Sequence, residues 1–268
     1  MSVLLALTIK LFIGALLGLI ISTTGVGGGV LVLPVLTYLF GMDALSAVAT
    51  ANLLSMLMKI SSTGMHFRMG NISFKRSMVI LAVMLPSTLI ASYGITFLAS
   101  VEAWHSYVQL AINILIVLAI AMSLFIFYKR LHQPEHLANQ SIPEQATSIS
   151  RFIIPGTCAG IIIGATGVGG GVVMLPLLIR YAGMNIKQAI GTSVFVTMLL
   201  SGASALAYGQ SGYTDVHLAL VLSIGSIFSI PLAKYLLNKW SDTTFQYITL
   251  GFILCSAVTM LYRLFVPV

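Results

Sequence analysis

The chain has 268 residues, of which 58% are hydrophobic and only 7% are charged, whereas a soluble protein has about 25% charged residues. So few charges cannot cover the surface of a water-soluble globule, which excludes a soluble enzyme, a nucleic-acid-binding protein and a disordered chain. The net charge of +7 comes from 13 Lys and Arg against 6 Asp and Glu, and the basic residues stand between long apolar runs. This pattern is typical of an integral membrane protein with basic cytoplasmic loops.

The apolar runs predict an all-α polytopic membrane protein with helical segments in two sets of five. Most segments have the roughly 20 residues that a helix needs to cross the hydrocarbon core, but the second and the seventh are too short. The first segment lacks the charged start and the cleavage site of a signal peptide, so we expect it to be retained. In chain order the segments are 3–21, 30–40, 44–63, 78–99, 107–128, 152–165, 172–182, 189–208, 216–237 and 245–264.

An internal repeat at an offset of 142 residues relates the two sets of segments, because the run Thr24–Val30 recurs unchanged as Thr166–Val172. The same offset links Leu33-Pro34 with Leu175-Pro176 and Gly41-Met42 with Gly183-Met184. We therefore expect two copies of one membrane unit, residues 1–128 and 152–268, joined by the polar linker 129–151.

Loop charge predicts that the two repeats have inverted topology. The loop 66–76 carries Arg68, Lys75 and Arg76, whereas the equivalent loop 209–217 carries only Asp215 and one histidine. Because basic loops stay in the cytoplasm, equivalent loops should lie on opposite sides of the membrane. This hypothesis places the linker in the cytoplasm and both termini on the opposite, periplasmic or extracellular, side of the membrane.

Each repeat has four glycines within five residues, where its short segment begins. They are Gly25, Gly27, Gly28 and Gly29 in the first repeat, and Gly167, Gly169, Gly170 and Gly171 in the second. Such a run breaks a helix, and a broken backbone at membrane depth is tolerated only inside protein or beside a wet cavity. The amides at the start of the next helix would face that cavity and favour an anion. The alternative is that the glycines only allow close helix packing.

The duplicated pattern T-G-x-G-G-G-x-x-x-x-P, followed by a T-S helix, resembles the TauE/SafE family of membrane permeases (DUF81) over nearly the whole chain. The second repeat fits the family pattern closely at Gly167–Pro176, Gly191–Ser193 and Gly212, whereas the first has Ala49–Ala51 in place of Gly-Thr-Ser. The resemblance implies a permease that moves sulfite or an organosulfonate such as sulfoacetate across the inner membrane, usually outward. Two inverted repeats would do so by alternating access.

Polar residues follow one face of the helix after each glycine break, because they recur every three or four positions. In the first repeat they are Asn52, Ser55, Lys59, Ser62 and His66, and the equivalents of the last four are Thr197, Ser201, Ser204 and Tyr208. Polar residues inside a membrane usually face a bundle interior or a water cavity, which indicates two walls of a substrate path. The alternative is hydrogen bonding between helices or to the helix backbone.

The predicted substrate site combines the glycine amides with hydroxyl, amide and ammonium groups. Lys59 attracts the anion in this hypothesis, whereas the alternative lets its side chain snorkel to the cytoplasmic interface. The predicted substrate-binding residues are Thr24, Gly25, Gly27, Gly28, Gly29, Thr50, Asn52, Lys59, Thr166, Gly167, Gly169, Gly170, Gly171, Thr192 and Ser193.

All six carboxylates fall in loops or at segment ends, so the sequence offers no carboxylate for a proton or sodium site at the midplane. We predict no metal, no cofactor, no nucleic acid and no catalytic residue; the partners are a small anion and the lipid bilayer, with homo-oligomerisation left open. An anion channel or a carrier of a non-sulfonate substrate is the alternative, followed by a membrane enzyme or assembly factor.

Overall fold

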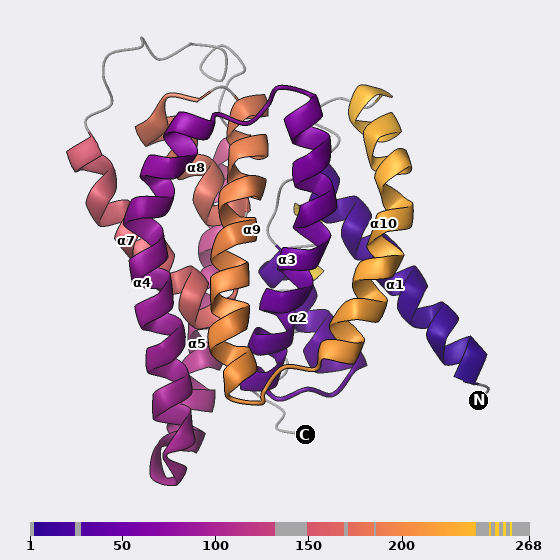
Figure 1. The fold of residues 1–268 in the computed structure, drawn as a ribbon, viewed down its shortest axis with the longest axis vertical. Coiled ribbons are helices and arrows are strands. Elements are labelled where there is room, and N and C mark those ends of the chain that lie inside the picture. Colours follow the sequence, from indigo (N-terminus) through magenta and orange to yellow (C-terminus); the bar gives the residue numbers. More distant parts are fainter. Residues whose placement is uncertain are drawn as a thin grey trace.

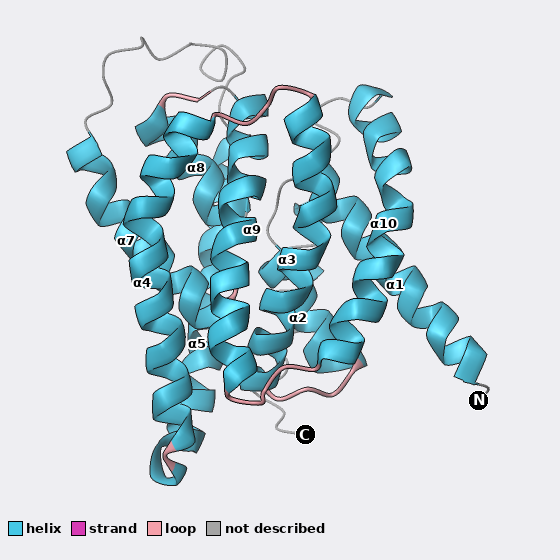
Figure 2. Ribbon diagram, in the orientation of Figure 1, coloured by secondary structure: helices cyan, strands magenta, loops and turns pink. Residues whose placement is uncertain are grey.

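The regular structure of the described chain is entirely helical (Figures 1 and 2). The computed structural model describes residues 3–24, 28–131, 149–168, 171–184 and 186–239, and six single positions between 247 and 258. The helices are α1 (Val3–Thr24), α2 (Gly28–Pro34), the π-helix η1 (Val35–Leu39), α3 (Ala44–Arg68), α4 (Phe74–Ser100), α5 (Glu102–Leu131), α7 (Ile149–Thr166), α8 (Gly171–Ala182), α9 (Ile186–Gln210) and α10 (Val216–Lys239).

These helices confirm the all-α fold class and the first nine predicted apolar segments. Segment 245–264 and the centre of the linker, 132–148, lie outside the described residues apart from the six single positions. The helices flanking the linker extend beyond the predicted boundaries, since α5 continues to Leu131 and α7 begins at Ile149.

Six of the described helices are long and apolar enough to cross a membrane. The segments that follow the glycine runs are not, because α2 with η1, and also α8, have only about two-thirds of the roughly 20 residues that are needed. The spans are Leu4–Thr23, Ala44–Arg68, Phe74–Ser100, Glu102–Ala121, Gln188–Gln210 and Val216–Leu236.

The same turn precedes α3 and α9. Gly41 and Gly183 both have a positive φ, of 65° and 58°, which a residue without a Cβ adopts at little cost. The next residue closes the turn on the preceding helix: the amide of Met42 donates to Leu36 O at 3.2 Å, and that of Met184 to Leu178 O at 3.3 Å. The internal repeat of the sequence is therefore repeated in backbone conformation and hydrogen bonding.

Helices α3 and α9 lie side by side in the centre of the bundle and run in opposite directions (Figure 1). Thr63, late in α3, donates to the Sδ of Met198 in the middle of α9 at 3.5 Å. Met56, in the middle of α3, lies against Gly202 in the second half of α9. These two helices are the most buried of the six spans, as expected for the core of the bundle.

The outer helices pack through small residues. Gly14 and Gly18 of α1 lie against Leu222 and Ser226 of α10. Gly160 of α7 lies in the same way against the backbone of α4 at Met84 and the side chain of Ser87. Small residues let helix backbones approach closely, which is how helices associate in lipid, where the hydrophobic effect does not draw them together.

The start of α3 is fixed by Asp43, whose carboxylate accepts hydrogen bonds from the amides of Leu45 and Ser46, both at 3.0 Å, and from Gln109 Nε2 of α5 at 2.7 Å. Partial burial raises the pKa of the Asp43 carboxyl, but the hydrogen bonds to the carboxylate outweigh it and hold the pKa below its usual value of 3.8. The ionised carboxyl therefore stabilises the fold above pH 3.8, and this stability is lost as pH falls through the lower pKa of the folded state.

We predict that Asp43→Ala lowers the free energy of unfolding by about 1 kcal/mol at neutral pH, because the cap of α3 is lost. The difference from the wild type should shrink as pH falls from 3.8 through the lower pKa of the folded state, where the Asp43 carboxyl becomes protonated. Thermal unfolding of both purified proteins in detergent, from neutral pH to below pH 3.8, measures this difference in stability. Glu102→Ala, at an exposed carboxylate in the first turn of α5, is the matched control. A difference that does not change with pH would contradict the role of the carboxylate.

Candidate substrate site

The two glycine breaks meet in the interior of the bundle. A Cβ on Gly29 would collide with the carbonyl of Gly167 and lie 2.6 Å from the Cα of Val168, so the two backbones touch without an intervening side chain. Gly167 has φ of +65°, and its amide donates to Ile163 O at 2.8 Å at the end of α7. Asn52 of α3 also reaches this point, because a Cβ on Gly167 would be 3.1 Å from Asn52 Nδ2. We call these four residues, Gly29, Gly167, Val168 and Asn52, the glycine junction.

Several predicted site residues are close to the junction residues in the sequence but are not described in full. Gly25, Gly27, Gly169 and Gly170 lie outside the described residues. Thr24 ends α1, whereas Gly28 begins α2 and Gly171 begins α8.

Asn52 and Ser55 are fully buried and carry unpaired polar atoms. Asn52 Nδ2 donates to Val48 O at 2.9 Å, but Asn52 Oδ1 and Ser55 Oγ have no hydrogen-bond partner among the described residues. An unpaired polar atom in the protein interior is costly, and in native structures water or a ligand usually satisfies it. The face of α3 at the glycine junction therefore has polar groups available to a bound molecule.

The same face of α3 carries two buried basic side chains. Lys59, two turns after Asn52, is only 2% exposed, and no described residue forms an ion pair or hydrogen bond with its ammonium group. This burial argues against the snorkelling alternative. His66, a further two turns on, is 4% exposed, and neither ring nitrogen has a partner among the described residues. Side chains of a helix lean toward its N-terminus, which directs Lys59 toward Ser55 and Asn52.

Three of the four residues of the polar stripe on α9 form hydrogen bonds within the protein. Thr197 Oγ1 donates to Ser193 O at 2.6 Å, Ser204 Oγ bonds Ser92 Oγ at 2.9 Å, and Tyr208 Oη donates to Gly164 O at 3.0 Å. The α9 stripe therefore agrees with the alternative interpretation, in which the polar side chains form hydrogen bonds between helices or to the helix backbone. The buried polar atoms of the two stripes that have no partner among the described residues all lie on α3, at Asn52, Ser55 and His66, so the two predicted walls differ.

Thr50 and Thr192 make equivalent contacts with distant loops. Thr50 Oγ1 accepts from the amide of Asp215 at 3.0 Å, and Thr192 Oγ1 accepts from the amide of Ser73 at 3.2 Å. Each pair joins a central helix to the residue before α10 or α4. These hydroxyls thus position loops, a contact that the sequence analysis did not predict.

Thr166 and Ser193, also predicted to bind substrate, are fully buried. Thr166 Oγ1 donates to Ile162 O at 2.6 Å and accepts from the amide of Val168 at 3.1 Å. Thr166 therefore stabilises the backbone of the second break where it touches Gly29.

Two features of the site were not predicted from the sequence. Ser22, near the end of α1, bonds Ser62 of the α3 stripe at 2.7 Å between hydroxyl oxygens, and no motif marks it. His66 was recognised as a member of the stripe, but its place near the end of a segment concealed that the side chain is buried.

The charges of the described chain separate toward the two ends of the bundle. Asp43, Glu102 and Asp215 lie where α3, α5 and α10 begin, whereas Arg68 and Lys239 lie where α3 and α10 end. Lys59 therefore has no carboxylate near it in the interior. The described residues hold no group of three His, Cys, Asp or Glu side chains suited to a metal ion.

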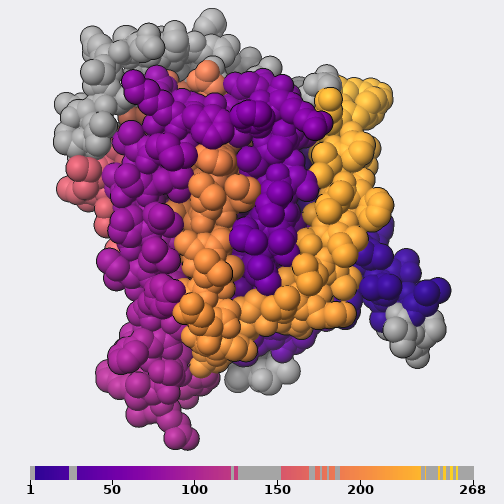
Figure 3. All heavy atoms as spheres, viewed as in Figure 1, coloured from indigo at the N-terminus to yellow at the C-terminus, as the bar shows by residue number. Residues whose placement is uncertain are grey.

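A surface cavity of about 580 Å³ lies between α3, α4 and α9, which form adjacent strips of the face in Figure 3. Its lining is apolar, with Met56, Leu85 and Met198 among the residues. It has no group that binds an anion and is separate from the polar face of α3.

The sequence comparisons agree with this architecture. The chain matches the family described as sulfite exporter TauE/SafE over residues 10–260. It belongs to this family. The TauE/SafE resemblance expected from the duplicated glycine motif is thereby confirmed.

Two relatives of this TauE/SafE protein are named as probable membrane transporters. It is 29% identical to the probable membrane transporter protein YjnA of Bacillus subtilis, with 94% of this chain and 96% of the relative covered. Identity is 27% to a probable membrane transporter protein of Methanocaldococcus jannaschii, with 89% of each chain covered. No solved structure gives a significant match. The protein is a multi-pass membrane transporter and not an enzyme.

We predict that Gly29→Ala lowers stability by about 1–3 kcal/mol, the usual cost of overpacking, because the added Cβ meets the backbone of Gly167 and Val168. Folded yield and thermal unfolding in detergent measure the effect. Gly64→Ala in α3 is the matched control, since a Cβ there has nothing within 4 Å and alanine favours the helix. Equal stability of the two variants would show that the breaks do not touch.

Proposed function

We propose that this TauE/SafE transporter is a secondary carrier of a small sulfur oxyanion, sulfite or an organosulfonate such as sulfoacetate, and that it binds the anion between the glycine junction and Lys59. The observation that carries the proposal is the burial of Lys59, 2% exposed, without an acidic partner among the described residues. A buried charge without a counter-ion is strongly destabilising, so a bound anion would remove that cost. A cationic substrate would increase it.

The glycine junction supports an anion site next to this charge. Helix α8 begins at Gly171, directly after the second break, and the amides of its first turn lack partners within the helix. Such amides and the helix dipole favour a negative group, and glycines let it approach the backbone closely. Asn52 and Ser55 add buried polar groups on the Lys59 side of the junction.

The sulfur chemistry of the substrate rests on the family. The family description names sulfite, whereas the names of the relatives give no substrate. A compact oxyanion fits the hydroxyl, amide and backbone donors of the predicted site, which suit oxygen acceptors.

We also propose that residues 1–128 and 152–268 are inverted repeats joined by the linker 129–151. The antiparallel pair α3 and α9 and the equivalent hydrogen bonds of Thr50 and Thr192 support this relation. Rocking of one repeat against the other around a central site is the mechanism expected for such a carrier. The basic ends of α3 and α10 favour a cytoplasmic location for that end, in a bacterial inner membrane, with the start of α1 on the periplasmic side.

We predict that sulfite or sulfoacetate raises the melting temperature of the purified protein in detergent and that Lys59→Met abolishes the shift. A ligand at a hundredfold excess over Kd stabilises the folded state by about 2.7 kcal/mol, and loss of the ammonium removes the charge that attracts it. The panel includes sulfate, taurine, acetate and chloride, and uptake into proteoliposomes gives the second readout. Lys10→Met, in the first half of α1, is the control for loss of a lysine outside the proposed site.

A shift and uptake that persist in Lys59→Met would contradict the role of this lysine. A response to none of the anions would overturn the anion site and direct the search to neutral or cationic substrates. Counterflow of labelled substrate then separates a carrier from a channel, because only a carrier exchanges label against its own gradient.

A further inference from the structure

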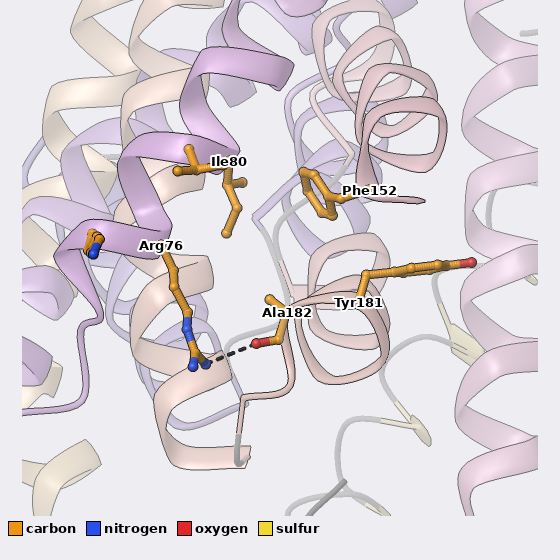
Figure 4. A pocket seen from close by; sticks show the side chains of 7 residues that line it. Arg76, Ile80, Phe152, Tyr181 and Ala182 are labelled. Carbon is orange, nitrogen blue, oxygen red and sulfur yellow. Dashed lines mark hydrogen bonds between the residues drawn. The ribbon is translucent and has the colours of Figure 1, made fainter. Parts of the chain in front are cut away.

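A pocket separate from the central site lies at the end of the bundle where α4 begins. Its volume is about 370 Å³, and it is bounded by the first two turns of α4, the start of α7 and the end of α8. Figure 4 shows Arg76, Ile80 and Phe152 around it, with Tyr181 and Ala182 below. The lining is completed by Lys75 and Val79.

Two basic side chains of this pocket have no acidic partner in the part of the chain that the structure describes. Lys75 is exposed and Arg76 is half-buried, and no described carboxylate pairs with either. Arg76 Nη1 donates to Ala182 O at 2.9 Å, which fixes the guanidinium at the end of α8 and uses only one of its five N–H donors. A pre-positioned guanidinium with free donors suits a phosphate group, which it can bind through two parallel hydrogen bonds.

The pocket has a basic level and an apolar level, stacked along α4. Val79 follows Lys75 by four residues, and Ile80 follows Arg76 by the same interval, so each apolar side chain lies one turn deeper along the helix than a basic one. Val79 is 36% exposed and Ile80 only 3%, while Phe152 closes the apolar level from α7. The apolar span of α4 begins at Phe74, so a membrane crossed by this helix would have its headgroup region at the basic level and its hydrocarbon at the apolar level.

We propose that this pocket binds an anionic phospholipid. Its phosphodiester group would contact Lys75 and Arg76, and one acyl chain would lie along Val79 and Ile80. A membrane surrounds this protein, and basic pockets between transmembrane helices on the cytoplasmic side are a known mode of lipid-headgroup recognition. A free phosphate ester would satisfy the two cations, but it would leave the apolar level unfilled.

The test measures lipid binding to the full-length protein after it has been delipidated in detergent. Thermal unfolding and native mass spectrometry are recorded with phosphatidylglycerol, with phosphatidylcholine of the same acyl chains, and with glycerol 3-phosphate. Phosphatidylglycerol should raise the melting temperature and remain bound, and the other two should have a much smaller effect.

Substitutions then assign the binding to the pocket. Lys75→Gln and Arg76→Gln should each weaken phosphatidylglycerol binding about fivefold, the share of one basic residue near a membrane surface. Arg68→Gln, an exposed arginine at the end of α3, is the matched control and should bind as the wild type does. Since Arg76 also holds the end of α8, Lys75→Gln and the charge-preserving Lys75→Arg decide the outcome if Arg76→Gln fails to fold.

Equal binding of phosphatidylglycerol and phosphatidylcholine would overturn the proposal, and so would wild-type affinity in Lys75→Gln. An equal response to glycerol 3-phosphate would show that the pocket binds a soluble phosphate ester and would overturn the lipid assignment. Weakened lipid binding in Lys75→Gln, together with unchanged binding in Lys75→Arg and Arg68→Gln, would support it. These outcomes do not depend on the transported substrate, because none of these residues lies in the central site.

Discussion

A helix that breaks within the hydrocarbon exposes amides and carbonyls that lipid cannot satisfy, so both breaks must be enclosed by protein. The fold meets this constraint by placing the breaks against each other at Gly29 and Gly167, with α3 and α9 as the central helices. The remaining helices then have defined roles: α1 and α7 lead the chain to the junction, and α4 and α10 cover them from outside. The polar interior follows from the same constraint, because the free amides and carbonyls of a broken helix in a membrane need groups that form hydrogen bonds with them.

The two halves share their backbone pattern but differ in their interior chemistry. In α9, Tyr208 closes on the carbonyl of Gly164, whereas His66 at the equivalent position of α3 makes no such contact with the described residues. Lys59 is likewise matched by the neutral Ser201. The buried unpaired polar atoms of the two stripes thus lie on α3, together with the charge of Lys59, and none of them lies on α9. Two copies of one backbone pattern can in this way carry different side chains at equivalent positions of the interior.

Much of the fold could be predicted from the sequence because it depends on apolarity and glycine. The segment 44–63 anticipates α3, although the helix continues to Arg68, since its last turns carry polar residues that hydropathy does not count. Two inverted repeats would place the two glycine breaks face to face, but the particular contact of Gly29 with Gly167 could not be predicted, because the repeat shows which residues are equivalent and not which backbones touch. Thr50 and Thr192 were predicted to bind substrate for their hydroxyls, but their partners are loop amides far away in sequence. The burial of Lys59 depended on the packing around α3, which no local pattern records.

The contact between Gly29 and Gly167 has one mechanical consequence. Interlocked side chains oppose the sliding of one helix along another, because they must change rotamer before the two packed surfaces can move. Here backbone meets backbone, and no side chain of either glycine needs to be unlocked. The proposed rocking of one repeat against the other would therefore meet no side chain of either glycine at this contact, and the broken helices would stay enclosed while it occurs.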